Sequence, residues 1–182
     1  MVCEGILEGR FVNLRSVTEE DAKFILEIRN DPEISKFLPS LNVTVNQQQG
    51  WINHQRKDSD SYYFMIEDKM NMSIGTISVY NIEKNRAEMG RFCSFGNPIQ
   101  NSEAALILDD FIFYKLGVNY LNIWVYKENE TVLSFNKGFG CEWKGESKDE
   151  KGIPYIYGTL TKEGFEIKSQ RIRTNLSKIK II

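Results

Sequence analysis

Ala87-Glu88-Met89-Gly90-Arg91-Phe92-Cys93-Ser94-Phe95 runs straight into Gly96-Asn97-Pro98-Ile99-Gln100-Asn101-Ser102, and the organisation of the chain follows from this stretch. Residues 87–95 are typical of a strand, and Gly90 in the middle predicts a bulge or a close approach of another backbone. Gly96 to Pro98 break the strand. Apolar residues then recur at helical spacing over 104–116, which predicts a largely buried helix behind a polar loop.

The residues on either side of this unit supply further strands and helices. Downstream, the pattern predicts a strand at 120–126, a short helix at 128–137, last strands at Trp143 and 155–160 joined by the charged turn 147–152, and a helical tail from 161. Upstream, it predicts a strand at 11–14, a helix from the Thr18 cap to Asn30, a helix at 44–57, and strands at 62–66 and 74–82. The order β-α-α-β-β-β-α-β-α-β-β predicts an α+β fold built on one mixed sheet.

Length and charge limit the number of domains and the class of partner. A chain of 182 residues fits a single domain, 1–182, with a basic tail from about 163. The 23 Lys and Arg against 25 Asp and Glu leave a formal net charge of -2, so neither nucleic acid nor a membrane surface is an expected partner. The apolar runs are too short to span a bilayer, and no secretory signal is expected at the N-terminus.

Cysteine and histidine usage argues against disulfides and metals. Cys3, Cys93 and Cys141 form no Cys-x-x-Cys pair and cannot all pair within the chain, so reduced thiols in the cytoplasm are expected. His54 is the one histidine, which excludes a multi-histidine metal site. No bound metal is therefore expected.

The polar loop before the buried helix has two interpretations. A helix N-terminus presents unpaired backbone N–H groups and a partial positive charge, so this loop would hold a pyrophosphate. Alternatively, Asn101 or Ser102 simply caps the helix, which is the commoner use of such residues and the interpretation that spacing alone favours.

Three short signatures in their order resemble the GNAT acetyltransferases, in particular the branch that acetylates ribosomal-protein N-termini and amino sugars. They are Arg29-Asn30-Asp31-Pro32-Glu33-Ile34, Ala87-Glu88-Met89-Gly90, and Asn129-Glu130-Thr131-Val132-Leu133-Ser134-Phe135-Asn136-Lys137 with Gly140. The resemblance covers about residues 10–162. It implies a mostly antiparallel central sheet flanked by helices and splayed between the strands 87–95 and 120–126. It also implies transfer of acetyl from acetyl-coenzyme A to an amine.

Two positions depart from the family pattern. The pyrophosphate loop of relatives has glycine where this chain has Glu103, and a carboxylate aimed at phosphates would repel them, so Glu103 must point away or the loop must hold coenzyme A differently. Many relatives have a tyrosine acid where this chain has Asn136, so that role is vacant or filled by water. A thiolate still leaves without a strong acid, because a thiol pKa is near 8.5. The Ser-Glu-Ala run at 102–104 resembles a subgroup associated with surface-glycan amino sugars.

Glu88 is the expected catalytic base, since the acceptor amine must be neutral to attack a thioester. In a regular strand Glu88 shares a face with Gly90, Phe92 and Ser94. The competing interpretation, equally supported, is an ion pair with a neighbouring Arg or Lys. Backbone N–H groups around 92–94 would stabilise the oxyanion.

The pantetheine arm of acetyl-coenzyme A is expected between the strand at 87–95 and residues 121–126, hydrogen-bonded like an added strand. Asn129 would anchor it or serve as a plain helix cap. Cys93 is expected to be a small strand residue rather than an acyl carrier, because no histidine lies near it in the sequence. The residues expected to bind the co-substrate are Phe92, Cys93, Ser94, Gln100, Asn101, Ser102, Glu103, Ala104, Ala105, Asn129, Phe135 and Asn136.

The acceptor side is expected to use the first two helices and the hairpins. The candidate substrate-binding residues are Arg29, Asn30, Trp51, His54 and Tyr80. An aromatic ring would stack on a sugar or base, and an arginine would contact a phosphate. Each also has an ordinary structural use, such as Trp51 in the core or Arg29 in an ion pair at a helix end.

The favoured function is direct N-acetylation of a small-molecule amine, with a nucleotide-linked amino sugar as acceptor. Acetylation of a protein N-terminal amine is the enzymatic alternative. A catalytically silent acyl-coenzyme A-binding module is the third, since fold does not guarantee activity. Exposed aromatic residues at the hairpins would fit a homodimer.

Overall fold

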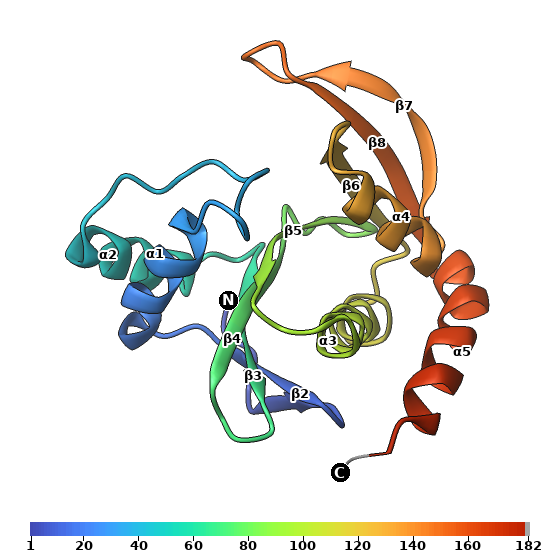
Figure 1. Cartoon of the computed structure of the whole chain (residues 1–182), viewed down its shortest axis with the longest axis horizontal. Helices are drawn as coiled ribbons and strands as arrows, with labels where there is room; N and C mark the ends of the chain where they lie inside the picture. The colour runs from blue at the N-terminus through green and yellow to red at the C-terminus, as the bar shows by residue number, and fades with distance from the viewer. Residues whose placement is uncertain (181–182) are drawn as a thin grey trace.

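One eight-stranded sheet runs through the molecule in the order β1-β2-β3-β4-β5-β6-β8-β7 (Figure 1). The computed structural model describes residues 1–180. Its strands are β1 (Ile6–Glu8), β2 (Val12–Ser16), β3 (Tyr62–Asp68), β4 (Ser73–Tyr80), β5 (Arg86–Ser94), β6 (Tyr120–Tyr126), β7 (Glu142–Lys148) and β8 (Pro154–Thr161). Within these residues every neighbouring pair of strands is antiparallel except β5 and β6. The predicted α+β fold with one mixed, mostly antiparallel sheet is therefore confirmed.

Helices cover both faces of the sheet. They are α1 (Ala22–Asn30), α2 (Val45–Gln55), α3 (Pro98–Asp110), α4 (Glu130–Phe139) and α5 (Lys162–Lys178). A short 3-10 helix, η1 (Glu19–Asp21), precedes α1, and a π-helical segment, η2 (Phe111–Lys115), continues α3. Figure 1 shows α1 and α2 on one side of β3–β5 and α3 on the other, with the hairpin β7–β8 projecting beyond α4.

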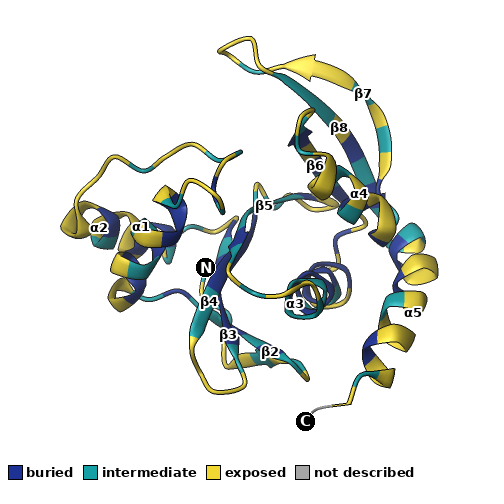
Figure 2. Cartoon of the chain, viewed as in Figure 1, coloured by how far each residue is buried: buried dark blue, intermediate teal, exposed yellow. Residues whose placement is uncertain are grey.

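The core has two parts, one on each face. The larger cluster lies between the sheet, α3 and α5 and includes Phe64, Phe113 and Phe165. The smaller one joins Ile25 of α1 and Ile52 of α2 to the sheet. Figure 2 shows α3 mostly buried or half-buried, whereas β7 is mostly exposed.

The tail expected to be basic and helical forms α5, and it packs on the core rather than standing free. Phe165, Ser169 and Leu176 are buried, and the Arg10 guanidinium donates to the carbonyl oxygens of Leu176 and Ser177 at the end of the helix. Residues 181 and 182 of the expected tail lie outside the described residues. No helix within residues 1–180 is long and apolar enough to cross a membrane.

Two sequence-based expectations need correction. β1 was not predicted, because three residues carry too little alternation to indicate a strand. The helix expected from residue 104 starts at Pro98, so the expected polar loop 97–102 is mostly helical. Asn97 caps it, not Asn101 or Ser102, because proline suits the first helical position and asparagine the position before it.

Candidate active site

A bulge in β5 shapes the site. β4 pairs Thr76 with Cys93 and Ser78 with Gly90, so Arg91 and Phe92 together lie opposite one residue of β4. Arg91 takes the extra position with φ 51, a left-handed conformation unusual for a residue other than glycine. The bulge therefore breaks the regular alternation of β5 directly after the candidate base, Glu88.

The bulge changes which residues share a face with Glu88. Tyr80, Ser78 and Thr76 of β4 lie opposite Glu88, Gly90 and Cys93, so these residues face α1 and α2. Phe92 instead packs against Phe135, with ring centroids 6.2 Å apart, and belongs to the core around α3. The expectation that Phe92 and Ser94 share the face of Glu88 was wrong, because the extra residue reverses the alternation.

β5 and β6 separate just beyond Glu88. They pair only from Arg86 with Tyr120 to Glu88 with Asn122, and past this point β5 pairs with β4 alone within residues 1–180. A cleft of about 400 Å³ opens there, lined by residues 89–94 of β5 and 123–126 of β6. The facing strand edges suit an extended arm that hydrogen-bonds like an added strand, so the residues present fit acetyl-coenzyme A.

Glu88 is half-buried at the start of this opening. Its carboxylate accepts hydrogen bonds from Asn81 Nδ2 at 3.1 Å and from Trp124 Nε1 at 3.4 Å. Within residues 1–180 no Lys or Arg lies within 4 Å of this carboxylate, so the structure does not contain the ion pair of the competing interpretation. Two neutral donors hold the side chain, and Trp124 also lines the cleft.

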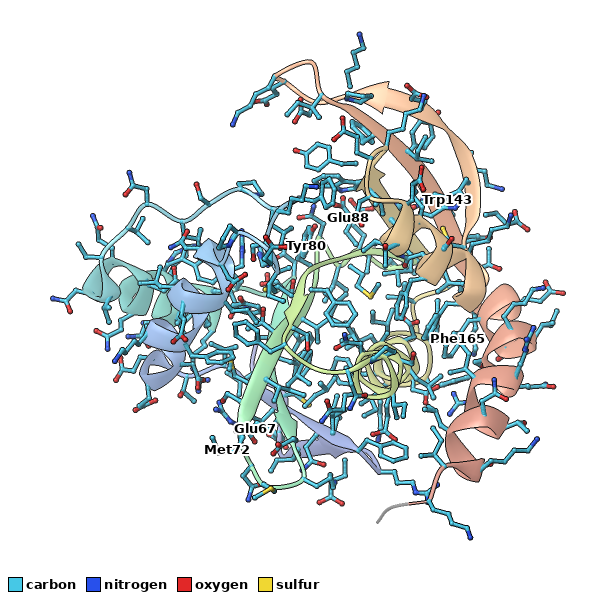
Figure 3. All side chains as sticks on the ribbon, viewed as in Figure 1. Glu67, Met72, Tyr80, Glu88, Trp143 and Phe165 are labelled. Atoms are coloured by element: carbon cyan, nitrogen blue, oxygen red, sulfur yellow. The ribbon has the colours of Figure 1, made fainter. Side chains whose placement is uncertain are left out.

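Tyr80 lies between Glu88 and Arg91 on this face. Figure 3 shows Tyr80 and Glu88 close together near the middle of the molecule. A Cβ on Gly90 would stand 2.6 Å from the Tyr80 hydroxyl, so the ring takes the space that a side chain at 90 would fill. Burial, and then the charge of Glu88, raise the pKa of Tyr80, which keeps its hydroxyl protonated as a donor at neutral pH.

Aromatic side chains extend from Glu88 along β6 and β8. Trp124 and Tyr126 lie on the face of Asn122, the partner of Glu88, and β8 places Tyr157 and Tyr155 opposite them. Adjacent rings lie 5.8 to 6.5 Å apart, and Trp124 is 47% exposed. We call these four residues the aromatic wall. Tyr126 donates to Asp149 at 2.9 Å, which fixes the end of the wall to the β7–β8 turn.

Arg91 lines the cleft on the other side of Tyr80. Its guanidinium carbon lies 4.6 Å from the ring centroid of Tyr80, 5.3 Å from that of Trp51 and 5.9 Å from that of Tyr63. Arg91 Nη1 donates to Ser78 Oγ at 3.4 Å. Cation–π contacts of this kind hold the planar group in one orientation.

The start of α3 is occupied by its own side chains. Asn97 Oδ1 accepts from the amides of Ile99 and Gln100, and Gln100 Oε1 accepts from the Asn97 amide. Asn101 alone of the predicted loop residues lines the cleft, where its buried Oδ1 has no hydrogen-bond partner within residues 1–180. Ser102 is half-buried and lies outside the cleft lining.

Glu103 points away from the cleft. Its carboxylate accepts from the backbone amides of Arg10, Phe11 and Val12 at 2.9, 2.5 and 2.9 Å. Glu103, which stands where relatives have glycine, therefore stabilises the β1–β2 turn. Its carboxylate does not face the phosphates of a bound co-substrate. Ala104 and Ala105 are buried in the core beside it, outside the cleft.

Asn129, Phe135 and Asn136, which were expected to bind the co-substrate, all line the cleft. Asn129 Oδ1 accepts from the Val132 amide at 3.3 Å, which makes it the cap of α4 as well as a lining residue. Asn136 also lines the cleft, but its amide donates to the Val132 carbonyl oxygen, so it stays on its own helix. Burial raises the pKa of the Cys93 thiol, which disfavours a thiolate nucleophile at this position.

The predicted acceptor residues separate into three groups. Tyr80 lines the cleft and Trp51 contacts Arg91 behind it. Arg29 donates to the Pro39 carbonyl oxygen and Asn30 exchanges two hydrogen bonds with Leu41, so both shape the α1–α2 connection, residues 31–44. His54 lies outside the cleft, its side chain 84% exposed.

The sequence analysis missed several residues that line the cleft. Arg91 comes directly after Gly90, the residue that predicted a bulge. The side chain of Arg91 was not predicted to line the cleft, because the direction in which it points depends on which residue takes the extra position of the bulge. The α1–α2 connection contributes Glu33, Ile34, Phe37 and Leu38, and no periodic pattern indicates where such a segment packs. Within residues 1–180 no group of three or more His, Cys, Asp and Glu side chains is placed to hold a metal ion.

Curated relatives and solved structures resemble this chain. Acetyltransferase PseH from Campylobacter jejuni subsp. jejuni serotype O:2 is 25% identical over 126 residues, which cover 66% of this chain and 76% of the relative. PseH from serotype O:23/36 is 23% identical over 124 residues, with the same coverage.

The solved structures are similar in fold. Apo FdhC, a nucleotide-linked sugar GNAT, superposes with a TM-score of 0.80 at 23% identity, covering 94% of this chain and 98% of its own. Spermidine N-acetyltransferase from Vibrio cholerae, solved with coenzyme A and spermine, gives 0.76 at 16% identity, covering 85% of this chain and 98% of its own.

The acetyltransferase (GNAT) domain family matches residues 12–142, a span that includes β5, the cleft and α4. Together with the β5–β6 separation, this match accounts for both the fold and the site. The chain therefore belongs to the GNAT acetyltransferases and is an acetyl-coenzyme A-dependent N-acetyltransferase.

Proposed function

We propose that this enzyme acetylates the amine of a nucleotide-linked amino sugar. The observation that carries the proposal is the aromatic wall beside Glu88. The faces of sugar rings and bases are flat and partly apolar, so they pack on exposed aromatic rings. The name of FdhC, a nucleotide-linked sugar GNAT, gives a precedent on the same fold.

Glu88 is the proposed general base. It lies where β5 and β6 separate, next to the wall, and neutral donors leave it free of a cationic partner within residues 1–180. It would take the proton of the acceptor ammonium, directly or through one water, and so leave the nitrogen lone pair free to attack.

Acetyl-coenzyme A supplies an acetyl group activated as a thioester. The backbone of residues 92–94, together with Asn101, Asn129, Phe135 and Asn136, would hold it, since all of them line the cleft. The unpartnered Asn101 Oδ1 supports a polar group of the co-substrate at that end. Gln100, Ser102, Glu103, Ala104 and Ala105 would contribute through the position of α3 rather than by side-chain contact.

We further propose that the enzyme works in the cytoplasm, which its three free thiols would suit. A homodimer stays a prediction. The aromatic wall, if it binds acceptor as proposed, is not available for self-association.

The test is a panel of amines assayed by release of free thiol from acetyl-coenzyme A. It contains uridine- and thymidine-diphosphate-linked amino sugars, the free amino sugars, spermidine and a peptide with a free N-terminal amine. We expect kcat/KM for one nucleotide-linked sugar to exceed all others by about 10-fold or more. Preference for the peptide would support N-terminal acetylation instead. Saturable acetyl-coenzyme A binding by calorimetry without turnover on any amine would support the silent module.

A further inference from the structure

Arg91 lines the cleft but has no role in the reaction proposed above. It occupies the strained position of the β5 bulge, where a left-handed backbone costs a residue with a side chain about 1 kcal/mol or more. Glycine next to it, at position 90, has φ outside that region, so the strain falls on the arginine. Such strain is tolerated where the direction of a side chain matters.

The guanidinium is oriented by rings but not neutralised. Tyr80, Trp51 and Tyr63 contact it, yet within residues 1–180 no carboxylate lies within 4 Å of its nitrogens. Among the described residues its guanidinium makes a single hydrogen bond, the long contact to Ser78 Oγ at 3.4 Å. A guanidinium has five N–H donors, so most of them remain available to a ligand in the cleft.

A second arginine adds to the positive charge of this region. Arg29 is 8% exposed and its Nε has no hydrogen-bond partner within residues 1–180. The charges of Arg29 and Arg91 both act on Tyr63, whose pKa burial raises to about 12. Glu33 on the α1–α2 connection lines the same cleft, and Glu88 lies beyond Tyr80 where β5 and β6 separate.

We propose that Arg91 is the anion-binding residue of the acceptor site and that it binds the diphosphate of the nucleotide-linked acceptor. The planar fork of an arginine matches phosphate oxygens two at a time. Tyr80 pairs with Glu88 across β4 and β5 and its ring contacts Arg91, so a ligand with its anion at Arg91 would have its amine near Glu88. A nucleotide-linked amino sugar has this layout, with its diphosphate one sugar ring from the amine.

This inference rests on the proposed function, since it names the group by which that substrate class is recognised. It is tested by binding as well as by turnover. UDP and inorganic pyrophosphate are titrated calorimetrically into the protein saturated with coenzyme A, which occupies its own phosphate sites. The variants are Arg91→Met and Arg91→Lys, with Arg171→Met on the exposed side of α5 as the matched loss of one charge.

We expect UDP and pyrophosphate to bind the wild type and Arg171→Met alike, and Arg91→Met to weaken both by about 10- to 100-fold. Arg91→Lys should recover part of the loss, because it keeps the charge without the fork. Thermal unfolding of each variant separates a binding defect from a folding defect. Equal UDP affinity in Arg91→Met and wild type, or no saturable UDP binding by the wild type, overturns the inference.

Turnover separates this inference from the proposed function. A high KM for the nucleotide-linked sugar in Arg91→Met, with kcat little changed, supports both. An unchanged KM in that variant refutes the role of Arg91 and leaves the sugar acceptor standing. UDP binding that depends on Arg91, with no acetylation of any nucleotide-linked sugar, supports the anion site and refutes the proposed acceptor.

Discussion

Glu88, the proposed base, is held by two neutral hydrogen-bond donors and not by a cation. A cation beside a carboxylate stabilises its ionised form and makes it a poorer base. Glu88 has Asn81 and Trp124 as donors instead, and Trp124 belongs to the wall on which the acceptor would stack. The same indole would therefore position both the proposed base and one side of the proposed acceptor site.

Replacing Glu88 by glutamine should lower kcat by about 100-fold or more, because the acceptor ammonium loses its base. The glutamine oxygen still accepts from Trp124, so acetyl-coenzyme A affinity and thermal stability should barely change. The deficit should shrink as pH rises, since more of the amine is then already neutral. Steady-state kinetics from pH 6 to 9 measure this, with Glu83→Gln in the exposed β4–β5 turn as control. The same pH profile for variant and wild type would exclude Glu88 as the base.

At the scale of elements, α3 is joined to the opposite end of the sheet by Glu103. Three consecutive amides of the β1–β2 turn donate to this one carboxylate, which is 6% exposed. Gly9 leaves the room, because a Cβ there would stand 2.6 Å from Glu103 Oε2. The residue that departs from the family pattern thus fixes the helix that borders the cleft.

Glu103→Ala should lower the free energy of unfolding by about 3 kcal/mol or more, because three backbone amides lose a buried, charged acceptor. Glu103→Gln should lower the free energy of unfolding by less, because its amide oxygen can still accept hydrogen bonds from these backbone amides. Urea denaturation measures both, and Glu27→Ala on the exposed side of α1 should stay within about 0.5 kcal/mol of wild type. Full stability of Glu103→Ala together with lost acetyl-coenzyme A binding would instead place Glu103 at the co-substrate.

The element scale also shows what the sequence predicts and where prediction stops. Alternation in 120–126 and the helical spacing in 104–116 are local; the strand formed where expected, and the helix formed but begins six residues earlier, at Pro98. Gly90 indicated the bulge, but which residue takes the extra position depends on pairing with β4, so Phe92 was assigned to the wrong face. Arg91 and the wall become a site only through contacts between distant strands. No local pattern contains that information.

At the scale of the whole molecule, one feature of the core that affects stability is a buried acid, Asp109. Asp109 of α3 is 1% exposed, and its Oδ1 has no hydrogen-bond partner within residues 1–180. Burial, and then the charge of Asp110, raise the pKa of Asp109 well above its ordinary value. The carboxyl of Asp109 therefore stays protonated to a higher pH in the folded protein than in the unfolded chain.

This difference makes global stability depend on pH. Because the pKa of Asp109 is higher in the folded state than in the unfolded chain, its contribution to the free energy of unfolding is fully present below about pH 4. That contribution is lost as pH rises through the folded-state pKa. Across that window each pH unit lowers the free energy of unfolding by about 1.4 kcal/mol.

Asp109→Asn removes the titrating group but keeps the shape of the side chain. We expect the variant to exceed wild type in free energy of unfolding by about 1 kcal/mol or more at pH 8, and the two to converge near pH 4. Urea denaturation at intervals between these values measures the difference. A constant difference across the range would show that Asp109 does not change its protonation on unfolding.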